Sequence, residues 1–76
     1  MKPTIGRIVI YRQPEAEAPV NGVREHPAVI TRVWGDGEAP AINCTVFFDA
    51  RAPEPRISVL PEPTGMSAAW RWPGKV

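Results

Sequence analysis

The sequence predicts a small all-β domain, a five-stranded closed barrel with a long first loop and a short C-terminal strand. Its 76 residues are enough for one domain (1–76) with one core. Ten prolines are spread along the chain, which disfavours long helices because an interior proline removes a backbone hydrogen bond. Five short apolar runs lie between turn residues, and this number suits a barrel better than a two-sheet sandwich.

The first predicted strand is residues 4–12, which are rich in isoleucine and valine. Residues 13–26 are polar and contain two prolines, so they form the long first loop. Within this loop Asn21-Gly22 is a favoured type I′ turn dipeptide and predicts a small hairpin. Residues 28–34 form the second predicted strand.

A turn at Gly35-Asp36-Gly37 leads to the third predicted strand, residues 41–48, whose apolar and polar residues alternate most clearly. A proline-containing loop at 49–55 follows, and residues 56–60 form a short fourth strand.

The chain turns again at residues 61–65. A single helical turn is expected at 67–69, and the final short strand is Trp70-Arg71-Trp72.

Strand alternation predicts which side chains face the core. On the third strand the inward residues are Ile42, Cys44, Val46 and Phe48, and the outward ones are Asn43, Thr45 and Phe47.

On the second strand Arg32 should not face a dry core, so Val29 and Val33 are predicted inward and Ile30 and Trp34 outward. On the first strand the prediction places Gly6, Ile8 and Ile10 inward, and Arg7, Val9 and Tyr11 outward.

The strand sequences resemble those of SH3-like barrels. The residues that carry the resemblance are Gly6-x-Ile8-Val9-x-Tyr11, Ala28-Val29-Ile30-Thr31-x-Val33 and Val46-Phe47-x-Asp49. Together with the tail Trp70-x-Trp72-Pro73, the chain also resembles small uncharacterised proteins of bacteriophages and prophages. The resemblance implies an architecture and a viral origin without implying a chemistry.

Composition excludes several classes of site. Cys44 is the only cysteine and lies in an apolar run, so it is expected to be a buried thiol, and disulfides are excluded. One Cys and one His do not make a zinc site, and no cofactor or metal is expected.

A net charge of +1 argues against general double-stranded DNA binding. No signal peptide or membrane-spanning stretch is seen, which predicts a cytoplasmic protein.

A catalytic site is not expected either. His26 is the only histidine, has no nucleophile in a recognisable motif, and is expected to be a solvent-exposed loop residue, with a hydrogen bond to a ligand as the alternative. The carboxylates are scattered through loops, and no glycine-rich phosphate-binding motif occurs.

The outward side chains predict a binding face instead. Its apolar and aromatic members, with arginines among them, have two alternative uses, namely self-association or nucleotide recognition by aromatic stacking and Arg–phosphate contacts. The candidate ligand-binding residues are Arg7, Tyr11, His26, Arg32, Trp34, Phe47, Trp70, Arg71 and Trp72.

The C-terminal strand has two alternative roles of its own. Trp70 and Trp72 share one face of a strand, with Arg71 opposite. The pair either caps the barrel or packs across a dimer, or else it offers a stacking platform with Arg71 as a phosphate ligand. A ligand pocket is expected near this seam.

These observations predict a non-enzymatic, phage-type binding protein. The leading hypothesis is an anti-defence sponge that sequesters a cyclic-nucleotide immune signal in a pocket shared between subunits, in the host cytoplasm. The alternatives are an SH3-like protein- or nucleic-acid-binding module that uses the same face, and a structural phage component. Because a core this small is marginal, at least a homodimer is expected.

Overall fold

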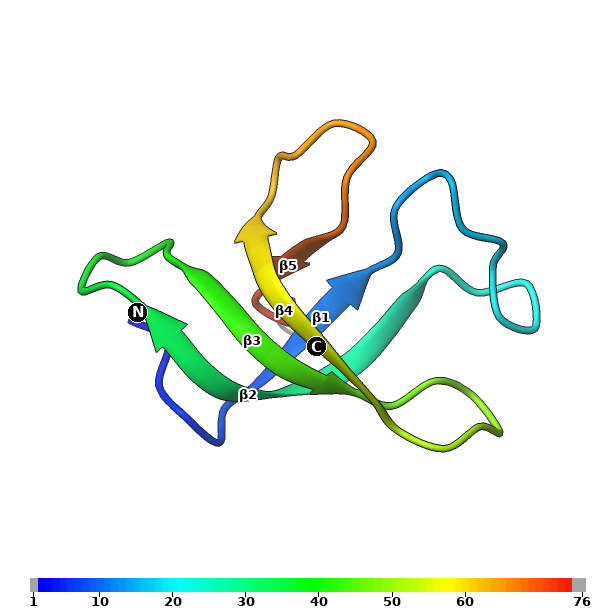
Figure 1. The fold of residues 1–76 in the computed structure, drawn as a ribbon, viewed down its shortest axis with the longest axis horizontal. Coiled ribbons are helices and arrows are strands. Elements are labelled where there is room, and N and C mark those ends of the chain that lie inside the picture. The colour runs from blue at the N-terminus through cyan, green and yellow to red at the C-terminus, as the bar shows by residue number, and fades with distance from the viewer. Residues whose placement is uncertain (1, 75–76) are drawn as a thin grey trace.

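The structure is a computed structural model that describes residues 2–74, and five strands form its framework (Figure 1). The described residues contain no helix, and so none long and apolar enough to cross a membrane. The strands are β1 (Ile8–Arg12), β2 (Glu25–Trp34), β3 (Ala41–Val46), β4 (Glu54–Pro61) and β5 (Ala69–Arg71).

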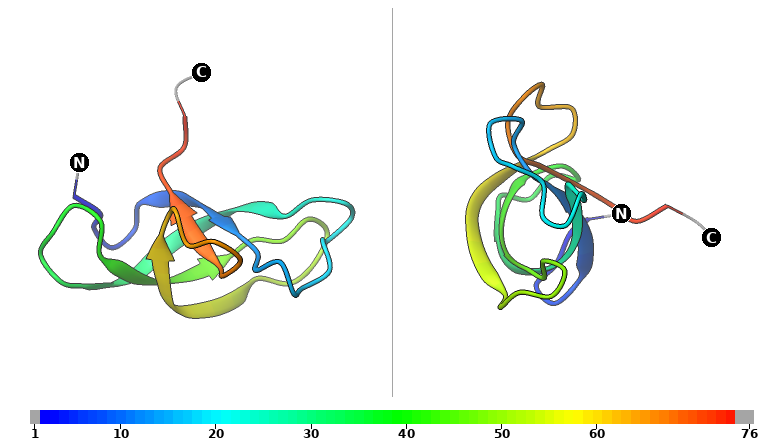
Figure 2. Two further views of the ribbon diagram at one scale, coloured as in Figure 1. Left: turned by 90° about the horizontal axis from the view of Figure 1, so that it is seen from above. Right: turned by 90° about the vertical axis from the view of Figure 1, so that its right-hand side faces the viewer.

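The strands close into one barrel in the order β1-β2-β3-β4-β5, which confirms the predicted small SH3-like barrel. Neighbouring strands are antiparallel except for β4 and β5, which pair in parallel, and β5 returns to pair antiparallel with β1. Figure 2 shows the strands curving around a common axis, with the connecting loops extending beyond them.

The strand bounds differ from the sequence prediction by up to four residues. β3 ends at Val46 rather than at residue 48, β4 covers Glu54–Pro61 rather than 56–60, and β5 covers Ala69–Arg71 rather than 70–72. β1 begins at Ile8 rather than at residue 4, because Gly6 adopts a φ of +92° and the N–H of Arg7 donates to Thr4 in a turn. β2 begins at Glu25, before the expected start, since it pairs along its whole first half with β1.

Of the two predictions for the loops, one is confirmed and one is wrong. The hairpin at Asn21-Gly22 is confirmed: both residues have positive φ, and Val20 and Val23 bridge across them. The helical turn expected at 67–69 is wrong. A tight turn stands just before it, in which Ser67 N–H donates to the carbonyl of Thr64, and Ala69 already belongs to β5.

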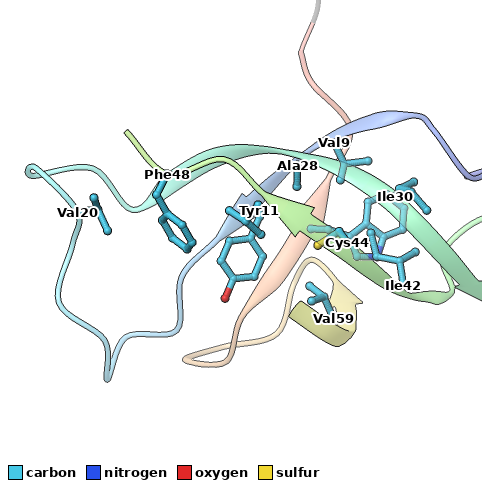
Figure 3. Close-up of a cluster of buried hydrophobic side chains, with 11 residues drawn as sticks. Val9, Tyr11, Val20, Ala28, Ile30, Ile42, Cys44, Phe48 and Val59 are labelled. Carbon is cyan, nitrogen blue, oxygen red and sulfur yellow. The ribbon is translucent and has the colours of Figure 1, made fainter. Parts of the chain in front are cut away.

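The core lies inside the barrel and draws on all five strands (Figure 3). The prediction for β3 is confirmed, since its alternate residues and the following Phe48 are buried, Cys44 among them. Burial raises the pKa of the Cys44 thiol to about 11, which keeps it protonated. The core residues are Val9, Tyr11, Val20, Ala28, Ile30, Ile42, Cys44, Val46, Phe48, Val59 and Trp70.

The prediction for β1 is inverted. Val9 and Tyr11 are buried, whereas Ile8 is exposed and Ile10 half-buried. Both faces of this strand are apolar, so alternation could not identify the inner one. The pairing with β2 decides it, because Val9 lies opposite the buried Ala28.

The prediction for β2 is half wrong, and a β-bulge explains why. Ile30 pairs with Cys44 and Arg32 pairs with Asn43, so Thr31 is an extra residue in the ladder. The bulge lets Ile30 and Val33 both pack against the core although they are three residues apart. Arg32 and Trp34 face outward as predicted.

Candidate functional site

The nine candidate residues do not form one site. Tyr11, His26 and Trp70 are buried in the barrel. Arg71 and Trp72 lie at the C-terminal seam, and Arg7 stands exposed before β1. Arg32, Trp34 and Phe47 remain on the outer face, so the predicted patch is smaller than expected.

Tyr11 packs in the core and not on the outer face. Its ring stands edge-on to Phe48, with centroids 6.5 Å apart, and the guanidinium of Arg56 lies 5.9 Å from it. Burial raises the pKa of the Tyr11 hydroxyl, although Arg56 opposes the shift. A ligand on the outer surface has no access to this ring.

His26 is 2% exposed, so its expected placement in a solvent-exposed loop is wrong. Gln13 donates from Nε2 to the carbonyl of Ala18 at 3.0 Å, and this turns its Oε1 toward the histidine. The His26 Nε2–H therefore donates to Gln13 Oε1 at 2.9 Å. The ring anchors the first loop to the barrel.

The surroundings of His26 keep it neutral. Its ring centroid lies 4.6 Å from that of Phe48. Burial lowers the pKa of the imidazole, Arg51 lowers it further, and Asp49 partly opposes the shift.

Trp70 is a core residue, and Trp72 packs on it. The Trp70 indole N–H donates to the carbonyl of Pro40 at 3.0 Å. The Trp72 ring stands at 89° to Trp70 with centroids 5.6 Å apart, a favourable edge-to-face contact. The pair therefore serves packing in this part of the barrel, as one of the two sequence alternatives predicted.

The seam beside these tryptophans does not suit a phosphate. Arg71 already donates two hydrogen bonds to the Glu25 carboxylate, both of 3.0 Å. A cavity of about 200 Å³ does lie here, but two carboxylates, those of Glu38 and Glu62, contribute to its lining. An anionic ligand would meet unfavourable charge and would have to displace Glu25 from Arg71.

The outer face of β2 and β3 carries the most organised exposed cluster. Trp34 is 46% exposed, and the guanidinium carbon of Arg32 lies 3.8 Å from the centre of its ring. The Trp34 indole N–H donates to Asn43 Oδ1 at 2.9 Å, and the backbone N–H of Ser58 donates to the same oxygen at 2.9 Å. We call Arg32, Trp34 and Asn43 the Arg–Trp surface.

Local structure explains how this surface is built. The bulge at Thr31 brings Arg32 opposite Asn43, and Trp34 follows two residues later on the same face. On β4, Ser58 adopts a φ of +52° opposite Asn43, where the β3–β4 register shifts. The amide of Asn43 thereby links three strands and fixes the orientation of the indole.

Asn43 is the residue that the sequence reasoning missed. Its position on the outward face of β3 was predicted, but its contact with Trp34 depends on a register that the sequence does not show. Phe47 continues the same outward row and is 43% exposed, between the buried Val46 and Phe48.

Arg32 has no carboxylate partner among residues 2–74, nor do Lys2 and Arg7. The other arginines in that part of the chain are held by carboxylates or backbone carbonyls: Arg12, Arg24, Arg51, Arg56 and Arg71. The Arg32 guanidinium therefore keeps its hydrogen-bond donors available while its plane is stacked on Trp34.

The other candidate sites among the described residues are weaker than the Arg–Trp surface. They contain no group of three or more His, Cys, Asp or Glu side chains placed to hold a metal ion. A cavity of about 490 Å³ lies between residues 2–5 and the turn at 35–37, and one of about 370 Å³ lies beside Arg12 and the 62–65 turn.

The functional assignment depends on the geometry of the chain itself, because comparisons with known proteins found no match. No family model, no curated protein sequence and no solved structure matches it.

Proposed function

We propose that this domain binds nucleotides, without chemical conversion, on the Arg–Trp surface. One observation carries the proposal: the Arg32 guanidinium is stacked at 3.8 Å on the exposed, hydrogen-bonded Trp34 ring and has no ion-pair partner among residues 2–74. Exposed aromatic rings and arginine planes are the usual stacking partners of bases, and arginine N–H groups are the usual ligands of phosphate.

Each member of the surface has a role in this proposal. Arg32 covers one face of the Trp34 ring, so a base stacks on a free face of the Arg32–Trp34 pair, and the outer N–H groups of Arg32 donate to a phosphate. The Asn43 side-chain NH₂ makes no hydrogen bond within the described residues and faces the same surface, so it donates to the edge of the base.

Two sources share this ligand chemistry: a cyclic nucleotide signal and a linear single strand. One form of the proposal is the sequestration of a cyclic-nucleotide immune signal by a phage-encoded oligomer in the host cytoplasm, and the other form is the binding of a linear strand. The absence of chemistry is supported by the burial of His26 and Cys44, which removes the two most reactive side chains from the surface.

Titration calorimetry with a panel of ligands tests the proposal. The panel contains adenosine and guanosine monophosphates, cyclic di- and trinucleotides, and oligothymidylates. Wild-type protein is compared with Arg32→Ala and Trp34→Ala, and with Lys2→Ala as a matched control that removes an unpaired cation elsewhere. We expect at least one ligand class to bind, with affinity reduced about fivefold or more by either surface variant, since each stacked base is worth ~1–3 kcal/mol.

The controls make the result decisive. A cooperative urea unfolding transition shows whether each variant is folded. No heat with any ligand, or equal losses in Lys2→Ala and Arg32→Ala, contradicts the proposal. Chromatographic detection of a product would show an enzyme instead.

A further inference from the structure

We infer that the ligand of the Arg–Trp surface is a linear single-stranded nucleic acid that runs along the outer face of β3 from Trp34 to Phe47. This inference rests on the proposed function and names the form of its ligand. It is carried by three features of the outer face, namely a continuous row of side chains, the distance between two exposed rings, and the charge along the row.

The row consists of the outward side chains of β3 together with Phe47, the residue that follows this strand. Asn43, Thr45 and Phe47 alternate with buried residues and are therefore on one face. Their β2 neighbours are Arg32 opposite Asn43, and Val29 opposite Thr45.

The row reaches its far end without a break in the backbone pairing. The Phe47 N–H still donates to the carbonyl of Pro27. β2 and β3 lie side by side over this whole length (Figure 1).

The two exposed rings are too far apart for one nucleotide. Four residues at ~3.3 Å each separate the backbone of Asn43, where the Trp34 indole is bonded, from that of Phe47 by about 13 Å. A stacked strand rises ~3.4 Å per nucleotide, so this distance corresponds to about four steps, which join about five nucleotides. A strand that stacks one base at each end uses both rings, whereas a mononucleotide uses one.

The side chains along the row do not repel a polyanion, and one of them can pair with a phosphate. The outward side chains of this path are Arg32, Trp34, Asn43, Thr45, Phe47 and Val29, which include one cation and no carboxylate. Neither Asn43 Nδ2 nor the Thr45 hydroxyl makes a hydrogen bond to another described residue, so both are available to sugars and phosphates.

The shape of the site favours a strand over an enclosed ligand. The three cavities described above are lined by other residues and include none of Arg32, Trp34, Asn43 and Phe47. The row is an open face, and open aromatic faces with a basic group are how single strands are bound without enclosure.

A length series tests the inference. Affinities of wild type, Trp34→Ala, Phe47→Ala and Phe47→Leu are measured by calorimetry for thymidine monophosphate and for oligothymidylates of two, four, eight and twelve nucleotides. Met66→Ala is the matched control, because it removes an exposed apolar side chain from the 64–67 turn. Phe47→Leu keeps a large apolar side chain without the aromatic ring, and it serves if Phe47→Ala does not fold.

In wild type we expect affinity to rise about tenfold or more between two and eight nucleotides and then to level off. Phe47→Ala and Phe47→Leu should remove that rise and leave monophosphate binding within about twofold, while Trp34→Ala weakens every length.

Two other outcomes overturn the inference while leaving the proposed function standing. One is binding that does not depend on length or on Phe47. The other is a cyclic dinucleotide that binds more tightly than every linear ligand. No binding at any length, by contrast, overturns the proposed function itself.

Discussion

Trp34 and Trp70 are the same residue type in opposite environments, and the difference comes from where each indole N–H finds its acceptor. Trp70 is 2% exposed and donates to the backbone carbonyl of Pro40, which lies in the β2–β3 connection. Trp34 is 46% exposed and donates to the side chain of Asn43 on the neighbouring strand. The first arrangement fills a core, and the second fixes the position of a ring that is exposed on an open surface.

His26 gives the residue-scale prediction, that stability falls as the pH is lowered from 7.5 to 5.0. Its pKa is lowered in the folded state, so below about pH 6.5 the unfolded chain binds a proton that the folded chain resists. The loss begins near pH 6.5 and continues toward the lower folded pKa, with a slope of at most about 1.4 kcal/mol per pH unit for one proton. Urea unfolding at a series of pH values measures it.

The control for this prediction is His26→Gln, which removes the only imidazole. The pH dependence between 5.0 and 7.5 should be lost in this variant even if its absolute stability is lower. The pKa of Glu54 is also lowered, by its hydrogen bonds to Arg51 and Arg56, but that contribution is lost only as the pH falls through the usual carboxyl pKa and below it, so it falls mainly under pH 5.0. An unchanged pH dependence in His26→Gln would contradict the assignment.

At the scale of elements, β5 is the shortest strand and is held from both sides. It pairs with β1 over three residues and with β4 over two. The Arg71–Glu25 ion pair joins the two strands that lie on either side of β1. Arg71 on β5 is opposite Ile10 of β1, and Glu25 on β2 is opposite Arg12 of β1. Trp70 adds the apolar contact that fastens β5 to the core.

The exposed ion pair gives the element-scale prediction. Arg71→Ala should cost less than about 1 kcal/mol, because both side chains are substantially exposed and such pairs contribute little. The same variant should leave nucleotide affinity unchanged, since Arg71 is not part of the Arg–Trp surface. Urea unfolding and calorimetry measure the two quantities.

Glu25→Gln is compared with Arg71→Ala in the same experiment, because the two variants together test whether the seam binds phosphate. It removes the negative charge that pairs with the Arg71 guanidinium and leaves Arg71 in place. If Glu25→Gln strengthened nucleotide binding and Arg71→Ala abolished it, the seam and not the Arg–Trp surface would be the phosphate site.

At the scale of the whole molecule, the barrel buries a modest share of the surface of the unfolded chain and leaves several large apolar side chains exposed. A chain of 76 residues buries only about 60–65% of its unfolded surface, so its stability alone is marginal. Large apolar side chains remain exposed on several elements, among them Ile8 on β1 and Ile57 and Leu60 on β4. Ile57 is 75% exposed, an unusual position for a residue in a paired strand.

The whole-molecule prediction is therefore self-association. Light scattering coupled to size exclusion should give at least twice the 8.4 kDa chain mass, and Ile57→Glu combined with Leu60→Glu should shift the protein toward monomer. Ile5→Glu is the control, because Ile5 is exposed in the N-terminal segment and not in a strand. A monomeric wild type at high concentration would contradict the prediction.

The sequence by itself determined the fold class, the number of strands, the hairpin at Asn21-Gly22 and the inward face of β3. It did so because proline placement, turn dipeptides and clean alternation act locally, within a few residues of the chain. Arg32 and Trp34 could be placed outward by the same local reasoning, since an unpaired cation avoids a dry core.

Only the tertiary structure decided the inner faces of β1 and β2, the burial of His26 and the existence of the Arg–Trp surface. β1 is apolar on both sides, so pairing with β2 had to select its inner face. The bulge at Thr31 and the contacts His26–Gln13 and Trp34–Asn43 depend on registers between strands and loops apart in sequence. Registers of this kind are set by closing the barrel around one core, a constraint that no short stretch of sequence contains.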